Sequence, residues 1–465
     1  MNREENLTGI LAQYGAELRF EDLPDEVVEH AKLLILDTVG VGLWGSTLAW
    51  GDMVARLVRD FGSAQEASLW GTSYRASPPD AALANGTFCH GFELDDIHKN
   101  ALIHAGAVTV VPTLAVAHER YVGKAVSGSE FITAVVAGCE IGARVGLISG
   151  LPQLKQGFHA AAMTGVFCSS AAVARALKVP AEQFIHALSL GASQAAGLMA
   201  AQHGAMVKRM HLGRSAQSGV YAGLLAQRGF TGIDNVLDAP YGGYLSAFGL
   251  NADIPAVKKS LRKDHETLNI GFKPYSSCAG THTSIDAVLH LMRQHPEIHH
   301  DTVERVDITM ATVNKDHVGW RYEPAGLTAA QMNLGYCVAV ALRHGNVFVE
   351  SFTPQAINDK DAVALAHRVV THTSGDYDQM GLEGRYAVHV QITLKNGQLF
   401  SAERTHAKGS YKHPLSKQEV VTKFERLAAS VFPKERVDAI FRLTDQLQDA
   451  ENVGDLDTML SKKLL

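Results

Sequence analysis

Hydrophobic residues recur at helical spacing through most of the first 265 residues. In the segment 26–45, five apolar side chains fall on one stripe with the period of an amphipathic helix. These are Val27, Val28, Ala31, Leu34 and Ile35. Similar patterns predict helices over 79–91 and 180–199. Ser127 and Glu130 have the spacing of a capping box, which marks the start of another helix.

The pattern changes after about residue 268. The segment 303–313 alternates and is rich in β-branched residues, which predicts a strand. The segment 385–405 predicts a β-hairpin, because its arms alternate and Asn396 and Gly397 supply the turn. Helical patterns lie over 281–295 and 329–345. Mixed helices and strands predict an α+β domain here.

The predicted fold is mainly α, with a large helical domain and a smaller α+β lid domain. A helical pattern returns over 416–432, so the C-terminus is expected to rejoin the first domain. The predicted boundaries are 1–267 for the N-terminal part of the helical domain, 268–405 for the lid domain and 406–465 for the returning helices.

Composition narrows the class of protein. The net charge of −6 gives no basic face for nucleic acid. The five cysteines are odd in number and lack C-x-x-C spacing, so neither a disulfide framework nor a zinc site is expected. The polar N-terminus is no signal peptide, and the apolar run 105–117 is too short to span a membrane. We therefore expect a soluble cytoplasmic protein with no membrane partner.

The glycines of GVGLWG, residues 40–45, match the dinucleotide-binding spacing G-x-G-x-x-G. That fingerprint requires a preceding strand and a βαβ unit. The preceding residues instead have helical period, which argues against nucleotide binding.

The window HGFELDDIHKNALIHAGAV, residues 90–108, concentrates titratable side chains between apolar segments. Three interpretations stay open from the residues alone. The window is a solvated acidic loop, or a metal site of Asp95, Asp96, His98 and His104, or a proton-transfer site. In the last case a carboxylate orients His104 as acid or base.

Four other segments contain residues with candidate chemistry, although each also has an ordinary structural explanation. His159 begins an apolar helix and could simply be a core or capping residue. Lys208, Arg209 and His211 form a basic cluster, suited to binding carboxylates or to the protein surface. Lys273 precedes a predicted helix N-terminus, which favours anions, although a surface lysine would also fit. Tyr336 lies on an apolar helix, where packing alone would explain it.

Together these segments resemble the MmgE/PrpD family over nearly the whole chain. That family includes 2-methylcitrate dehydratases, cis-aconitate decarboxylases and iminodisuccinate epimerase. The likeness rests on the segment EVVEHAKLLILDTVGVGL, the window H-x-x-E-L-D-D…H-x-G, and the motifs GFH, MVKRMH-x-G, YGGYL, KPY-x-x-C and AAQMNLGY.

The resemblance implies a site between the two domains, a homodimer, and no metal or cofactor. It implies catalytic roles for His104, His159, Lys208 and Tyr336. The substrate-binding residues are then expected to be Glu93, Asp96, Arg209 and Lys273. Glu93 and Ile97 replace the Asp and Thr of the usual D-x-D-D-T motif, which argues against 2-methylcitrate dehydration.

The shared chemistry of the family is formation of a carbanion beside a carboxylate. Our leading hypothesis is an epimerase of a small dicarboxylate, similar to iminodisuccinate epimerase, because of the ELDD and MVKR forms. A lyase such as cis-aconitate decarboxylase is the alternative, and a non-catalytic helical scaffold is the third.

Overall fold

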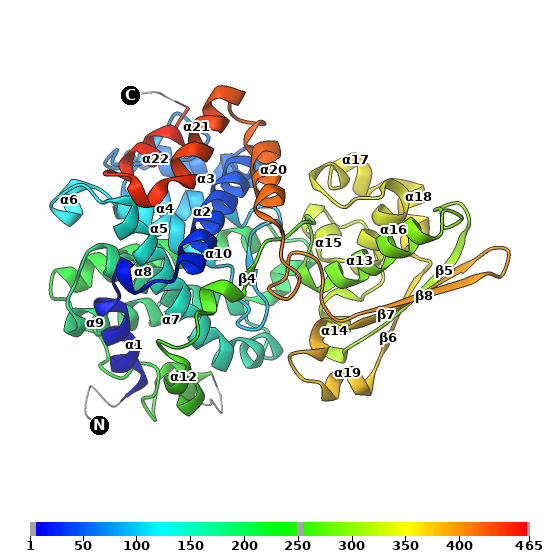
Figure 1. Cartoon of the computed structure of the whole chain (residues 1–465), viewed down its shortest axis with the longest axis horizontal. Coiled ribbons are helices and arrows are strands. Elements are labelled where there is room, and N and C mark those ends of the chain that lie inside the picture. Colours follow the sequence, from blue (N-terminus) through cyan, green and yellow to red (C-terminus); the bar gives the residue numbers. More distant parts are fainter. Residues whose placement is uncertain (1–5, 249–253, 463–465) are drawn as a thin grey trace.

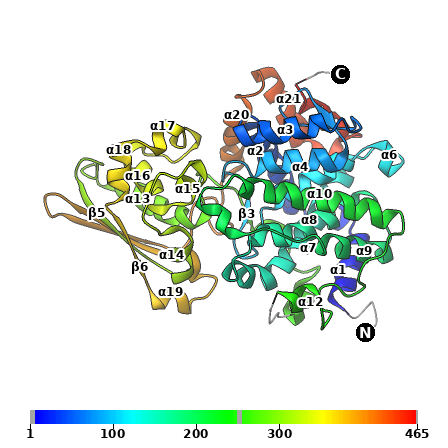
Figure 2. The same ribbon diagram turned by 180° about the vertical axis from the view of Figure 1, so that it is seen from behind.

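The chain forms a large helical lobe and a smaller α+β lobe that lie side by side (Figures 1 and 2). The computed structural model describes residues 6–248 and 254–462. The large lobe contains α1 (Leu7–Glu17), α2 (Asp25–Gly45), α3 (Ala49–Asp60), α4 (Pro78–Cys89), α5 (Ala105–Val116), α6 (Glu119–Val122), α7 (Gly128–Lys155), α8 (Ala160–Ala176), α9 (Ala181–Ala192), α10 (Val207–Gln227), α11 (Tyr244–Ala247) and α12 (Ile254–Ser260). The predicted fold class, mainly α with a smaller α+β part, is confirmed.

Long apolar helices form the core of the large lobe. Helix α7 packs against α8, and α10 packs against both α8 and α4. The predicted capping box at Ser127 is present: its side chain accepts the Glu130 amide, and the Glu130 carboxylate accepts the Ser127 amide. Helix α7 is long and apolar enough to cross a membrane by length and composition, but 89% of its most apolar stretch is buried among other helices. Because so much of it is buried, α7 is a core helix of the large lobe.

The GVGLWG glycines lie inside α2, and the described residues before them, from Asn6 onward, form helices and short loops without a strand. At Gly45 a Cβ atom would come within 1.9 Å of the Phe88 carbonyl oxygen. The glycine therefore permits close packing of α2 on α4. The arrangement lacks the strand–turn–helix context that nucleotide binding requires.

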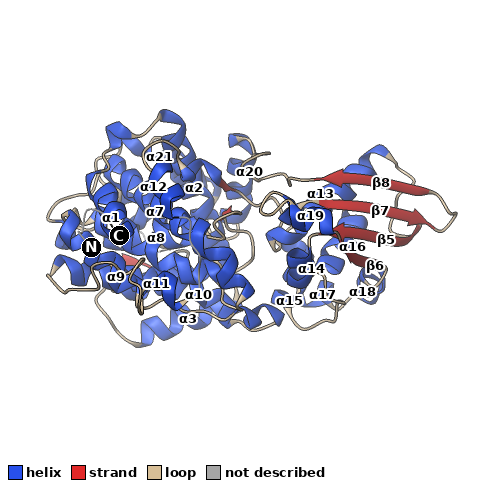
Figure 3. Cartoon of the chain, turned by 90° about the horizontal axis from the view of Figure 1, so that it is seen from below, coloured by secondary structure: helices blue, strands red, loops and turns tan. Residues whose placement is uncertain are grey.

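The smaller lobe is built on a four-stranded sheet in the order β6-β5-β7-β8. Its strands are β5 (Val303–Met310), β6 (Val369–Thr373), β7 (Val388–Leu394) and β8 (Leu399–Arg404). Strands β7 and β8 form the predicted antiparallel hairpin, and β5 lies between β7 and the parallel strand β6. Figure 3 shows the sheet at the end of the lobe far from the large lobe.

The smaller lobe also contains seven α-helices among the described residues. They are α13 (Ala279–Gln294), α14 (Thr312–Val318), α15 (Leu327–Met332), α16 (Leu334–His344), α17 (Pro354–Ile357), α18 (Lys360–Ala366) and α19 (Gly375–Gln379). Of these, α13, α14 and α16 pack against the sheet. The helix predicted over 329–345 is divided at Asn333, whose side chain accepts the Tyr336 amide and caps α16. The helix predicted over 180–199 ends at Ala192, and the strand predicted to 313 ends at Met310.

The C-terminal helices pack on the large lobe. Helix α20 (Lys417–Ala428) lies along α2, followed by α21 (Lys434–Asp445) and α22 (Gly454–Met459) (Figure 1). The short strands β3 (Ile97–His98) and β4 (Ile270–Gly271) pair and join the acidic window to the chain entering the smaller lobe. This arrangement agrees with a returning C-terminus, while the exact boundaries at 267 and 405 stay predictions.

A buried ion pair inside α7 anchors the same junction. Glu140 and Arg144 lie together, and the Glu140 carboxylate accepts the Thr267 amide at 2.8 Å. The Arg144 guanidinium donates to the Asp264 carbonyl at 2.7 Å. The connection between the lobes is therefore fixed to the core of the large lobe. All five cysteines are buried and unpaired in this structure.

Candidate active site

The acidic window is buried, so the solvated-loop interpretation is wrong. It runs from the end of α4 to the start of α5, and none of its carboxylates or histidines is more than 7% exposed. Burying this many ionisable groups is costly unless each is paired. The window must therefore be held by specific partners.

Asp96 holds the C-terminal end of the window by capping α5. Its carboxylate accepts the Ala105 amide at 2.7 Å and the Gly106 amide at 3.0 Å. Amides at a helix N-terminus lack partners within the helix, and a carboxylate also suits the positive end of the helix dipole. At Gly106 a Cβ would approach Thr38 Oγ1 to 1.9 Å, so only glycine lets α5 begin this close to α2.

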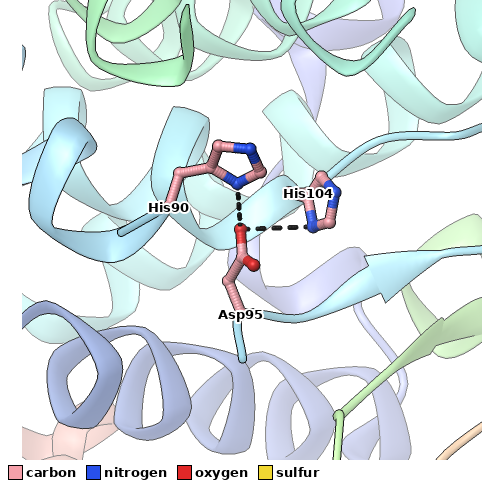
Figure 4. A group of neighbouring side chains, drawn as sticks. All are labelled: His90, Asp95 and His104. Atoms are coloured by element: carbon pink, nitrogen blue, oxygen red, sulfur yellow. Dashed lines mark hydrogen bonds and ion pairs between the residues drawn. The ribbon is translucent and has the colours of Figure 1, made fainter. Parts of the chain in front are cut away.

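Asp95 holds two histidines with one oxygen (Figure 4). Its Oδ2 lies 2.7 Å from His90 Nδ1 and 3.2 Å from His104 Nδ1. His104 Nδ1 also lies 2.7 Å from the Asp96 carbonyl oxygen. Since both contacts of His104 Nδ1 are acceptors, this nitrogen carries the hydrogen. Nε2 of neutral His104 is then the unprotonated nitrogen, available for proton transfer.

The surroundings set the protonation states of this group. Burial lowers the pKa of His104 below its usual value, although the Asp95 carboxylate opposes the shift. Burial also lowers the pKa of His90 to about 3. Burial alone would raise the pKa of Asp95, but His104, His90 and Lys273 hold it well below its usual range. Neutral imidazoles around an ionised Asp95 are the resting arrangement.

Glu93 joins three cations to the window. Its carboxylate contacts Lys208 Nζ, lies 2.7 Å from Arg209 Nη1 and 3.4 Å from Lys273 Nζ. Burial raises the pKa of Glu93, but the three cations outweigh it and keep the group ionised. Glu93 has a φ of 53°, in the left-handed region. Such strain in a non-glycine residue costs about 1–3 kcal/mol and is typical of functional sites.

Further imidazoles continue from this cluster. The ring of His90 lies 4.8 Å from that of His104 and 5.4 Å from that of His159 between centroids. His159 Nδ1 contacts His211 Nδ1 at 3.0 Å. Burial and the nearby Lys208 hold the pKa of His159 well below its usual value. His159 is therefore neutral at neutral pH.

A cavity between the lobes brings these groups together. Its polar lining from the large lobe consists of Glu93, His104, His159 and Lys208. Residues from beyond the junction complete it, including Lys273, Cys278, His317, Arg385 and Tyr386. Burial lowers the pKa of Lys208, while its Glu93 partner opposes this shift. The cavity thus combines neutral imidazoles, which can move protons, with buried cations, which can stabilise negative charge.

The structure brings five of the eight predicted site residues to the cavity wall: Glu93, His104, His159, Lys208 and Lys273. Arg209 lies behind Glu93 and donates to Gln331 Oε1 at 2.8 Å. Asp96 is occupied by the amides of α5. Neither lines the cavity, so both support the site instead of facing it.

The placement of Tyr336 in the site is corrected. Its hydroxyl donates to the Ser351 carbonyl at 2.7 Å, and its ring packs against Tyr322 and Phe352. It borders a different depression, which Arg343 and Arg426 also line. Tyr336 is therefore a packed core residue whose hydroxyl group already has a hydrogen-bond acceptor.

Several residues of the site were not assigned from the sequence. His90 was given no role from the sequence, and Asp95 was considered only as a metal ligand. Both lie in the acidic window, and their titratable side chains were the available signal. Arg385 and Tyr386 lie directly before β7. In the sequence, the only sign of this pair was that Arg385 is a charged residue at the start of a predicted strand. Whether Arg385 lies near the window depends on how the two lobes pack.

The four residues considered as metal ligands, Asp95, Asp96, His98 and His104, do not point to one common position. His98 Nε2 contacts Glu266 at 3.0 Å, and Asp96 caps α5. His90, Asp95 and His104 do place donor atoms within 4.8 Å of one another. Lys208 Nζ lies 3.4 Å from His90 Nε2 and Lys273 Nζ lies 3.8 Å from Asp95 Oδ1. These ammonium groups repel a cation, so the trio fits a proton-transfer role better.

An inter-lobe cavity lined by imidazoles and buried cations defines a class of acid/base site for anionic ligands. The comparisons with known proteins place the chain more closely. Residues 9–253 match the MmgE/PrpD N-terminal domain and residues 275–448 the MmgE/PrpD C-terminal domain. The chain belongs to the MmgE/PrpD family.

Similar proteins extend over nearly the whole chain. The cis-aconitate decarboxylase-like protein oryM of Aspergillus oryzae is 32% identical, covering 99% of this chain and 98% of its own length. A cis-aconitate decarboxylase of Aspergillus terreus is 29% identical, covering 99% and 97%. The cis-aconitate decarboxylase of Homo sapiens is 26% identical, covering 95% and 92%.

Proposed function

We propose that this protein is a lyase that releases carbon dioxide from a small unsaturated tricarboxylate of the cis-aconitate type. Relatives named for that activity, similar over nearly the full length, support the reaction class. The observation that carries the proposal is the shared cavity: His104, Lys208 and Lys273 all line it. A neutral imidazole and two ammonium groups then face one bound anion.

Decarboxylation breaks the bond between a carboxylate carbon and its neighbour. The electron pair of that bond stays on the substrate as carbon dioxide leaves, and it is delocalised over the adjacent double bond and a remaining carboxylate. Lys208 and Lys273 stabilise this enolate-like charge because their positions are fixed before the reaction. Protonated His104 then delivers a proton to the carbanion, and a solvent proton restores the imidazolium.

The proton balance of His104 depends on the ligand. Burial favours the neutral imidazole in the free protein. A bound polycarboxylate adds negative charge near His104, which favours the imidazolium. Asp95 steadies the charged ring through Nδ1, at 3.2 Å. Substrate binding and protonation of the acid are therefore coupled.

Epimerisation, the leading hypothesis from the sequence, uses the same groups differently. It requires a neutral base that removes a proton and a second group that returns one on the opposite face. The relatives named above support the lyase and not the epimerase. We therefore treat epimerisation as the outcome that would replace the proposal.

The test is incubation of the purified protein in deuterated water with cis-aconitate and, separately, with an optically active amino- or iminodicarboxylate. Release of carbon dioxide, with one deuterium in the product, supports the lyase. Deuterium exchange into an amino- or iminodicarboxylate with loss of optical activity and no mass loss would instead establish an epimerase. A scaffold without activity would show neither reaction, and Lys208→Met and His104→Asn would then change nothing measurable.

A further inference from the structure

Arg385 is a buried cation without a polar partner among the residues that the structure describes. It is 4% exposed and lies in the short 3₁₀ helix Gly384–Tyr386 that precedes β7. Its Nε and Nη1 atoms are buried and make no hydrogen bond. A guanidinium offers five donors in a planar fork and remains charged when buried. Leaving it unpaired is costly, which indicates that an acceptor is missing.

The side chains that interact with Arg385 carry no negative charge that could balance its guanidinium. Its guanidinium lies 5.0 Å from the ring centre of Tyr386, and Lys99 Nζ lies 4.8 Å from the same ring. Burial lowers the pKa of His317 to about 3, and the charge of Arg385 adds to that shift. Arg385 therefore interacts with a neutral imidazole, a phenol ring and a second cation, and with no carboxylate in the part of the chain that the structure describes.

Two other cations that line the cavity differ from Arg385 in this respect. Lys208 and Lys273 line the same cavity as Arg385, but both contact the Glu93 carboxylate. Their charges are compensated in the free protein, whereas that of Arg385 is not. The cavity therefore has a second cationic position, supplied by the smaller lobe, that is ready for an anion.

We infer that Arg385 binds a substrate carboxylate remote from the carbon on which His104 acts, forming a second carboxylate subsite. This inference rests on the proposed function and assigns a ligand with at least two separated carboxylates. Planar carboxylates match the guanidinium fork in a two-point contact. Because Arg385 belongs to the smaller lobe and Lys208 to the larger, such a ligand bridges the lobes.

The experiment measures binding of propane-1,2,3-tricarboxylate, which lacks the double bond needed for reaction, by calorimetry. In Arg385→Gln, binding should weaken by about ten- to a hundredfold, the scale of lost charge-assisted hydrogen bonds. Arg385→Lys should recover part of the affinity because it restores the charge but not the fork. The control is Arg305→Gln, because Arg305 lies on β5 with a 51% exposed side chain paired to Asp307.

Folding is checked by thermal unfolding of each variant. Arg385→Gln should unfold at or above the wild-type temperature, since it removes an uncompensated buried charge. Unchanged tricarboxylate binding in a folded Arg385→Gln variant overturns the subsite, even if the wild type releases carbon dioxide. Conversely, Arg385-dependent binding without any carbon dioxide release supports the subsite and refutes the proposed function. Equal weakening in Arg305→Gln would also refute the subsite.

Discussion

Lys423 of α20 connects the C-terminal segment to the window, and its removal tests how the site is supported. Its Nζ lies 2.7 Å from Asp37 Oδ1 of α2 and donates to the Leu94 carbonyl at 2.7 Å. The two side chains are 5% and 0% exposed. Burial raises the pKa of Asp37, and the charge of Lys423 counteracts this shift. The carboxylate therefore depends on this lysine.

We expect Lys423→Met to lower the free energy of unfolding by about 3–5 kcal/mol, the cost of leaving one member of a buried ion pair alone. The freed Leu94 carbonyl contributes to that cost, since an unsatisfied buried group costs about 1–3 kcal/mol. Urea unfolding at pH 7, followed by circular dichroism, measures the change. Lys434→Met is the control, because Lys434 has a 79% exposed side chain and an exposed pair contributes about 1 kcal/mol at most.

The double variant Asp37→Leu/Lys423→Met distinguishes two effects of losing Lys423: the unpaired buried charge of Asp37 and the loss of the hydrogen bond that positions the window. With the carboxylate removed as well, most of the lost stability should return, because a buried pair replaced by apolar residues is often neutral. The Leu94 carbonyl still lacks its donor, so kcat/KM should stay at least about tenfold low through misplaced window residues. A single variant as stable as wild type, or a double variant no more stable than the single, would refute this reasoning.

Four further predictions concern the chemistry and the packing. His104→Asn and Lys208→Met should each lower kcat by about a hundredfold or more, while the surface variants His344→Asn and Lys434→Met should not. If His104 acts as an acid, kcat/KM should rise as pH falls from 8 toward the lowered pKa of His104; a fall over this range would indicate a base and favour epimerisation. Gly106→Ala should destabilise the protein by about 1–3 kcal/mol through its clash with Thr38, whereas Gly375→Ala, with open space around its Cβ position, should be nearly neutral in urea unfolding. Calorimetry in two buffers of different ionisation enthalpy should show uptake of about one proton when a tricarboxylate binds.

Local signals in the sequence account for most of the secondary structure. The capping box at Ser127 and the turn at Asn396 and Gly397 depend only on nearby residues, and both form as predicted. The division at Asn333 also had a local signal, since asparagine before an apolar run is a helix cap. Because the apolar residues on both sides of Asn333 have helical spacing, the pattern predicted one continuous helix instead of two.

The partners of buried polar groups could not be predicted from local patterns. Asp95 and Asp96 are adjacent and alike in chemistry, yet one binds two imidazoles and the other caps α5. The apolar helix around Tyr336 indicated that this residue is buried. Periodicity does not show which part of the protein a buried side chain contacts, so it could not separate a core position from a position in the site. The position of Arg385 beside the window depends on contacts between segments almost 300 residues apart. The family resemblance supplied what periodicity could not, at His104, His159 and Lys208.

The charges around the cavity explain why binding should be coupled to proton uptake. Lys99, Lys208, Arg209, Lys273 and Arg385 supply five positive charges, and Glu93, Asp95 and Asp96 supply three negative ones. With the histidines neutral, two positive charges remain for the ligand. A dicarboxylate balances them without protonating His104, whereas a tricarboxylate leaves one negative charge in excess. Protonation of His104 removes that excess and creates the acid that decarboxylation needs, so a third carboxylate would both select the substrate and prepare the catalyst.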